Sequence, residues 1–350
     1  MPNPGRGVRL RGNALTSTGK VRENNEDHVF LWDSDSFMLA IVADGMGGAV
    51  AGEEASRIAV QTIEHGLFQN SDQPREQMYD AVPADVLSDR LREVIRTANA
   101  NIVQQTVNSP HLRGMGTTIT LALVRSTYAV IGHVGDSRAY LVDGQDGSIS
   151  QITSDHSFVE AMVAAGHITR EEAEDHPMRN VLYRALGQAE DVDVDVYHSY
   201  LRAGDRLILC SDGLTLHVKP EEIAQGALAD RTPEAISRKL VELANSRGGR
   251  DNVSVITIIV EEDGVASAES DTAKIKTAVE DETVILRERE RGPFVSSESK
   301  PSERVETHDS HASTQFAPRA RANESALGFR LRREPDSDYI REGSDALRRD

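Results

Sequence analysis

The sequence predicts an α+β fold in which helices pack on the outer faces of β-sheets. Apolar, β-branched runs follow one another directly between residues 117 and 142, so we expect antiparallel neighbours joined by tight turns. Helical segments come in pairs instead of after every strand. This pattern disfavours a doubly wound parallel sheet and favours a layered α+β arrangement.

The expected strands are short apolar runs bounded by Gly, Asp or Asn, which are residues that end strands and begin turns. Eight segments meet this description: residues 29–32, 38–43, 117–124, 128–134, 139–142, 192–197, 206–210 and 253–260.

Four helices are expected. The first two, over residues 52–68 and 84–107, lie between the second and third strands. The second has a single apolar stripe at helical spacing, formed by Leu87, Leu91, Val94, Ile95, Ala98 and Ile102. Residues 220–228 and 233–245 precede the last strand, and each begins with Pro, which costs nothing in the first turn of a helix.

The composition of the chain changes near residue 262. Residues 263–350 hold 19 acidic and 15 basic residues, a net charge of −4, so −14 of the total −18 belongs to residues 1–262. Large apolar residues are rare after this point, and such a segment cannot bury enough surface to offset its ordering entropy. We therefore expect one folded domain over 1–262 and a disordered, mixed-charge tail over 263–350.

Charge and cysteine content exclude several classes of protein. A net charge of −18 disfavours nucleic acid and anionic membranes as partners. The single cysteine, Cys210, excludes an internal disulfide framework and a cysteine-based zinc cluster. The sequence shows neither an apolar run of membrane-spanning length nor the apolar core of a signal peptide, so a cytoplasmic location is expected.

Four acidic motifs suggest a shared site for divalent cations. Asp44-Gly45 and Asp212-Gly213 each end an apolar run, where the glycine permits a sharp turn and leaves the carboxylate at the rim of a sheet. The other two motifs are Glu26-Asp27 and Asp251-Asn252. Oxygen donors of this kind suit magnesium or manganese, with Asp44 as the natural bridge between two ions and the Gly45 carbonyl as a further donor. Single Asp-Gly pairs usually mark plain turns, so the prediction of a cation site depends on all four motifs occurring together.

Six ordered motifs make the chain resemble bacterial members of the metal-dependent, type 2C serine/threonine protein phosphatases. They are residues 21–27, 42–48, 114–118, 132–138, 211–214 and 251–254, within a resemblance that spans about residues 8–261. The resemblance implies an α-β-β-α sandwich: two central antiparallel β-sheets flanked by helix pairs. It also makes residues 1–262 a catalytic domain that hydrolyses phosphoserine and phosphothreonine, using a metal-activated bridging water at a binuclear Mn²⁺ or Mg²⁺ centre and no covalent intermediate.

The resemblance also implies roles for single residues. Asp44 would bridge both ions and Gly45 would donate its carbonyl, while Asp212 and Asp251 would complete the first ion. Glu26 would lie beside the second ion. The remaining roles would be phosphate binding by Arg22, orientation of metal-bound water by Asp27, outer support by Asn252, and a third, weaker ion at Asp136.

One position departs from part of the family. Met46 stands where several eukaryotic members carry a histidine proposed as general acid, so protonation of the leaving group would fall to metal-bound water or another residue. The bacterial flap over the site corresponds to about residues 157–188, in which Asp175 is a weak candidate for the third ion.

Several other residues invite functional readings, but structural ones are favoured. Cys210 lacks the arginine six positions later that a cysteine phosphatase needs, because Leu216 stands there, so a buried strand residue is expected. The Asp191-Val-Asp193-Val-Asp195 run is better explained by an alternating, half-solvated strand than by a phosphoaspartate motif. His133 is expected to be a core histidine and His156 to be part of a helix start. Arg138 is expected to be an ion-pair partner.

The expected partners are phosphorylated proteins, including serine/threonine kinases. Two alternatives remain open from the sequence: a phosphatase of a sigma-factor regulatory switch, and a non-catalytic phosphoprotein-binding scaffold. In the tail, Thr283 lies among acidic residues with Leu286 three positions on. If phosphorylated, it could bind a phosphothreonine-reading domain.

Overall fold

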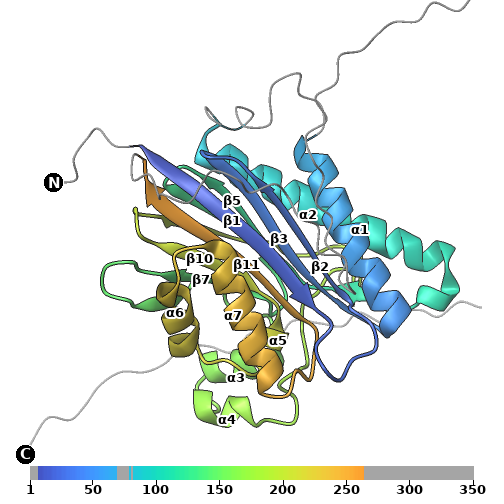
Figure 1. Cartoon of the computed structure of the whole chain (residues 1–350). Helices are drawn as coiled ribbons and strands as arrows, with labels where there is room; N and C mark the ends of the chain where they lie inside the picture. Colours follow the sequence, from blue (N-terminus) through green and yellow to red (C-terminus); the bar gives the residue numbers. More distant parts are fainter. Residues whose placement is uncertain (1–6, 69–78, 80–81, 264–350) are drawn as a thin grey trace, which may run out of the picture. The chain divides into compact units, whose positions relative to one another are not determined.

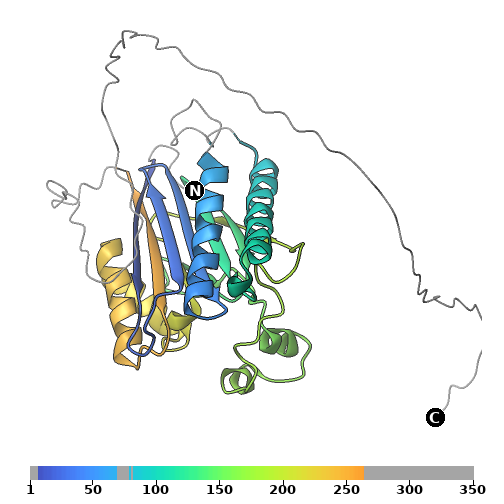
Figure 2. The same cartoon turned by 90° about the vertical axis from the view of Figure 1, so that its right-hand side faces the viewer.

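Two antiparallel β-sheets pack face to face at the centre of the molecule, with helices on both outer faces (Figures 1 and 2). The structure is a computed structural model, and it describes residues 7–68, 79 and 82–263. Apart from Asp263, the predicted tail, including Thr283, lies outside the described residues. The domain boundary at residue 262 therefore stays a prediction.

The first sheet has five strands in the order β1-β11-β10-β7-β8. Every neighbouring pair in it is antiparallel. Its strands are β1 (Val8–Ser17), β11 (Val253–Glu262), β10 (Arg206–Cys210), β7 (Arg138–Val142) and β8 (Ile149–Gln151).

The second sheet follows the order β2-β3-β5-β6-β9, and the short strand β4 pairs with the end of β3. These strands are also antiparallel. They are β2 (Asp27–Asp33), β3 (Phe37–Met46), β4 (Gly116–Thr117), β5 (Ile119–Arg125), β6 (Tyr128–Val134) and β9 (Asp195–Tyr200).

The helices form two outer layers. Helices α1 (Ala49–Phe68) and α2 (Ala84–Asn108) cover the second sheet, and α6 (Pro220–Ala229) and α7 (Pro233–Ser246) cover the first (Figure 1). Three shorter helices accompany α5 (Asp212–Thr215): a 3₁₀ turn at Pro110–Leu112, α3 (Phe158–Ala164) and α4 (Arg170–Glu174).

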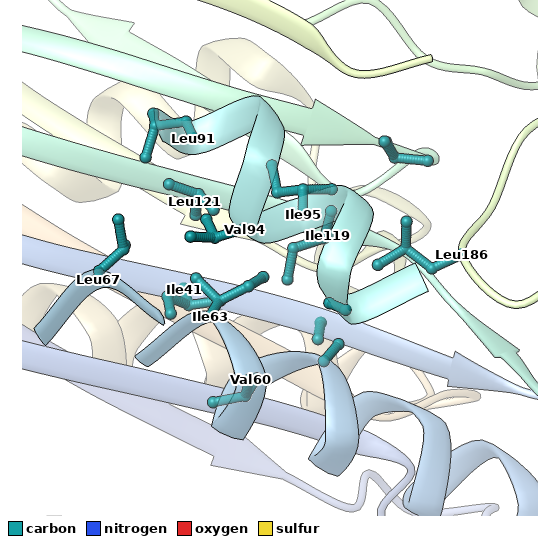
Figure 3. Close-up of a cluster of buried hydrophobic side chains, with 14 of the residues drawn as sticks. Ile41, Val60, Ile63, Leu67, Leu91, Val94, Ile95, Ile119, Leu121 and Leu186 are labelled. Atoms are coloured by element: carbon teal, nitrogen blue, oxygen red, sulfur yellow. The ribbon is translucent and has the colours of Figure 1, made fainter. Parts of the chain in front are cut away.

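Three apolar cores hold these layers together, and β3 contributes to two of them. Leu39, Ile41 and Ala43 point toward α1 and α2, in the core shown in Figure 3. The alternating residues Met38, Ala40 and Val42 point into the core between the sheets. Successive side chains of β3 point to opposite faces of the sheet and both sets are apolar, as expected for a sheet that is covered on both sides. The third core lies between the first sheet and α5–α7.

The predicted α+β fold with two antiparallel sheets between helical layers is confirmed. Two strands, β1 and β8, were not predicted, and the single strand expected over 117–124 divides into β4 and β5. In β1 only Leu10 and Thr16 are buried, so the apolar signal of this sheet-edge strand is weak. The strand predicted over 192–197 was wrong at its start: Val192 and Val194 are buried, but the ladder begins only at Asp195.

The packing in Figure 3 makes α2 a test of the layered core. Leu91→Ala removes a fully buried side chain, and we expect the free energy of unfolding to fall by about 2–5 kcal/mol. Val86→Ala on the same helix is the matched control. Val86 is 51 % exposed, so we expect a change within about 0.5 kcal/mol. Urea unfolding followed by circular dichroism measures both. Equal effects of the two substitutions would contradict this packing.

Candidate metal centre

The predicted acidic residues come together because strand ends from both sheets meet at one edge of the sandwich. Asp27 and Asp44 lie directly opposite each other in the β2–β3 ladder. Asp212 begins α5 immediately after β10, and Asp251 lies just before β11, the neighbour of β10. Residues separated by more than 200 positions in the sequence therefore share one site.

The backbone of Asp44 is held firmly on the β5 side. Its N–H donates to Thr118 Oγ1 at 3.0 Å, and its carbonyl accepts from Thr118 N–H at 2.8 Å and from Thr117 Oγ1 at 2.9 Å. Thr118 was not predicted as a site residue. These bonds leave the carboxyl group of Asp44 free to face the other carboxylates.

The Asp44 and Asp212 carboxyl groups lie close enough for each to perturb the pKa of the other. Loss of hydration, followed by the charges of Asp27, Asp212 and Asp136, raises the pKa of Asp44 well above its usual range. The pKa of Asp212 is also raised, first by loss of hydration and then by Asp251. The raised pKa values show that this cluster of negative charge is unfavourable and would be relieved by positive charge.

Asp27 is buried and held by two serines. Its Oδ2 accepts from Ser211 Oγ at 2.8 Å and from Ser254 Oγ at 2.7 Å. Its Oδ1 is buried and has no hydrogen-bond partner among the described residues. Burial raises the pKa of Asp27 to about 7, although the two serine bonds oppose the shift. An unpartnered buried oxygen of this kind fits a donor such as cation-bound water, which is the role predicted for Asp27.

Arg22 forms an ion pair with Asp251, with Nη2 and Oδ2 at 2.7 Å. The Arg22 side chain remains 49 % exposed, so the guanidinium is accessible from solvent. The Asp251 hydrogen bond raises the pKa of Arg22, which stays charged in any case. The predicted phosphate ligand thus contacts a predicted metal ligand.

Glu26 is held through its backbone, and its side chain packs against the start of α1. Its N–H donates to Asn252 Oδ1 at 2.8 Å, so Asn252 supports Glu26 from the β11 side. A Cβ atom on Gly52 would lie 1.9 Å from Glu26 Oε2, which shows how closely the helix approaches. Loss of hydration raises the pKa of Glu26, and the nearby Arg22 charge lowers it.

Asp136 joins the same cluster from the turn after β6. Burial and the charges of Asp212 and Asp155 raise its pKa well above the usual range. The neighbouring Arg138 does not neutralise it fully, because that guanidinium is bound by Asp155 through both Nε and Nη2. Asp175, by contrast, lies exposed at the C-terminal end of α4, within the segment predicted as a flap.

The donor set fits small hard cations that retain water. In the part of the chain that the structure describes, no group of three His, Cys, Asp or Glu side chains is placed to hold a metal ion together. Magnesium typically takes one or two carboxylates and completes its shell with water, so three converging side chains are not required. The close carboxyl groups of Asp44 and Asp212, the Gly45 carbonyl and the open oxygen of Asp27 suit this mode of binding.

The structural readings of Cys210, His133, His156 and Arg138 are confirmed, whereas the strand expected over residues 191–195 begins only at Asp195. Cys210 is fully buried, and burial raises its pKa to about 12, so it is no nucleophile. His133 is a core histidine bound to Thr120 Oγ1 at 2.9 Å. His156 precedes α3, whose N-cap is Ser157. Arg138 is the ion-pair partner of Asp155.

Comparison with known proteins identifies the family. The model of the protein phosphatase 2C family matches residues 16–247. The chain is 37 % identical over 244 residues to a serine/threonine phosphatase of Listeria monocytogenes, covering 69 % of this chain and 93 % of the relative. It is 39 % identical over 247 residues to PstP, a serine/threonine protein phosphatase of Mycobacterium tuberculosis, covering 71 % of this chain but only 44 % of that relative.

A solved structure extends the comparison to the fold. The catalytic domain of PstP, crystallised with two manganese ions, superposes with a TM-score of 0.60 at 36 % identity, covering 73 % of this chain and 99 % of that one. The chain therefore belongs to the protein phosphatase 2C family of serine/threonine protein phosphatases.

Proposed function

We propose that the chain hydrolyses phosphoserine and phosphothreonine in proteins with the help of two manganese or magnesium ions. The observation that carries the proposal is the confinement of Asp27, Asp44 and Asp212 in one poorly hydrated site with raised pKa values. Such a cluster is costly unless cations neutralise it. The manganese ions in the PstP structure support this interpretation.

The proposed ligands follow the strand ends. Asp44 would bridge the two ions and the Gly45 carbonyl would add a donor. Asp212 and Asp251 would bind the first ion, Glu26 would lie beside the second, and Asp136 would contribute to a weaker third. When bound, two such ions supply an activated water and stabilise the charge that develops during in-line displacement at phosphorus.

Arg22 would bind the substrate phosphate, because a planar guanidinium can donate two parallel hydrogen bonds to phosphate oxygens. In the structure this group is bound to Asp251 Oδ2. A cation held by Asp251 would compete with Arg22 for the same carboxylate, which would leave the guanidinium available for phosphate. Cation binding and phosphate binding would then be coupled through Asp251.

A direct displacement without a covalent intermediate agrees with the side chains at the site. The nearby thiol of Cys210 is buried with a raised pKa, and the Ser211 hydroxyl donates to Asp27. Neither group is prepared to attack phosphorus. Met46 offers no proton for the leaving group, so that proton would come from water at the site.

The proposed substrates are phosphorylated proteins, with serine/threonine kinases among them. The cytoplasmic location and the docking of a phosphothreonine-reading domain at Thr283 stay predictions. Within the described part of the chain, no helix has the length and apolarity needed to cross a membrane.

Removing the proposed bridging ligand Asp44 together with Asp212 tests the metal centre. We expect Asp44→Ala with Asp212→Ala to lower manganese-dependent hydrolysis of p-nitrophenyl phosphate at least about 100-fold, because the two cations would lose their bridging ligand and one further carboxylate ligand. Asp89→Ala, an exposed aspartate on α2, is the control and should act like the parent chain. Full activity in the double variant would refute the proposed function.

Replacing Arg22 tests the phosphate site. Arg22→Ala should reduce kcat/KM about 10–100-fold, mainly through KM, since charge-assisted hydrogen bonds to phosphate are lost. Arg22→Lys should recover only part of this loss. Arg9→Ala removes a comparably exposed ion pair, with Asp35, and should leave the kinetics unchanged. An unchanged KM in Arg22→Ala would contradict phosphate binding by this residue.

The raised pKa of Asp27 predicts how the stability of the metal-free protein depends on pH. Its pKa is about 7 in the folded chain and about 3.9 in the unfolded chain, so the folded state binds the proton more tightly. This contribution to stability is complete below about pH 4 and is lost as the pH rises through about 7. Asp27→Asn should weaken that pH dependence, measured by urea unfolding in the presence of a chelator. An equal slope in parent and variant would show that Asp27 does not titrate in this way.

A further inference from the structure

The first turn of α1 packs directly on the Glu26 and Gly45 side of the site. A Cβ atom on Gly45 would lie 2.1 Å from the Gly52 carbonyl oxygen, and one on Gly52 would lie 1.9 Å from Glu26 Oε2. No space separates the helix from these two groups. A small shift of α1 would therefore be transmitted to the Glu26 carboxylate and to the Gly45 backbone.

Ser56, one turn further along α1, is fully buried and binds the backbone of Glu26. Its Oγ lies 2.6 Å from the Glu26 carbonyl oxygen, closer than to the carbonyls of Gly52 at 3.2 Å and Glu53 at 3.1 Å. A hydroxyl has one proton to donate, and the shortest contact takes it. The same Glu26 carbonyl accepts from Gly45 N–H at 3.2 Å, so it links α1 to the end of β3.

His28 orients this hydroxyl. Its Nδ1 lies 2.9 Å from Ser56 Oγ, and the imidazole is 3 % exposed. Since the serine proton goes to Glu26, Nδ1 must be the donor in this contact. The hydrogen-bond count thus assigns the Nδ1–H tautomer to His28. The result is a directed chain of bonds from His28 through Ser56 to the Glu26 carbonyl.

Asn252 holds the backbone of Glu26 on the side opposite Ser56. It accepts the Glu26 N–H and donates its own amide to the carbonyls of Thr18 at 3.0 Å and Asn24 at 2.9 Å. Both backbone groups of Glu26 are therefore bound, the N–H by Asn252 just before β11 and the carbonyl by Ser56 on α1. We propose that Ser56, oriented by His28, is a positioning residue that holds Glu26 and Gly45 in place for the second cation. This inference rests on the proposed function.

The positioning role predicts a specific loss in Ser56→Ala. Residues that support metal ligands contribute about 10–100-fold to metal affinity, so we expect the dissociation constant for Mn²⁺ to rise about tenfold. Calorimetric titration of the full-length, chelator-treated chain with manganese chloride measures it directly. The manganese concentration for half-maximal hydrolysis of p-nitrophenyl phosphate should rise in parallel, while kcat at saturating manganese stays within about threefold.

Two variants of His28 test the direction of the chain of bonds. The side-chain amide of His28→Asn can place an N–H near the position of Nδ1, so manganese affinity should stay close to that of the parent chain. His28→Leu has no donor and should weaken manganese binding as Ser56→Ala does. These variants also decide the question if Ser56→Ala fails to fold. Equal affinities in the Asn and Leu variants would overturn the proposal.

Ser237→Ala is the matched control. Ser237 is also a fully buried helix serine that binds a strand, with Oγ 2.9 Å from Thr257 Oγ1, but it lies on α7 against the other sheet. We expect it to lower the melting temperature about as much as Ser56→Ala while keeping the manganese affinity of the parent. Parental affinity in Ser56→Ala, with only a matching loss of thermal stability, would overturn the positioning role. A parent chain that binds no manganese would instead refute the proposed function.

Discussion

The repulsion between carboxylates confined at one edge of the sandwich is the constraint on which the site depends. Asp44 and Asp212 lie close together, and Asp27 and Asp136 add to the charge around Asp44. Coulomb energies between such groups grow as water is excluded, so the site must bind positive charge. Arg22 supplies part of this charge at Asp251, and the raised pKa values of Asp44 and Asp212 favour protonation of the remaining carboxylates.

A rigid frame of neutral groups makes this confinement possible. Thr118 holds the backbone of Asp44, Ser211 and Ser254 hold one oxygen of Asp27, and Asn252 holds the N–H of Glu26. These partners come from the ends of β5, β10 and β11. The apolar cores beneath the site keep those strands in register. The stabilisation from this packing offsets the electrostatic cost of bringing like charges together.

Much of the fold could be predicted because the period-2 and helical patterns are strong. Strands β6 and β10 have the predicted bounds, and the apolar stripe of α2 is buried as expected. The strand predictions fail where backbone pairing, and not an alternating hydrophobic pattern, defines the strand. β1 is half exposed yet pairs along its whole length with β11, and β9 begins three residues later than the alternation of Val192 and Val194 predicts. Backbone pairing decides these strands, and it leaves little trace in hydrophobicity.

The acidic set was predictable by itself, because Asp-Gly steps after apolar runs mark carboxylates at strand ends, and six ordered motifs identify the family. Ser56, His28, Thr118 and Ser254 were not. Their importance depends on hydrogen bonds between elements that are distant in the sequence, such as Ser254 to Asp27. The sequence alone determined which oxygen donors the chain carries and in what order. Only the tertiary structure decided which neutral groups hold them in place, because that choice depends on the packing of α1, β5 and β11 around the same edge.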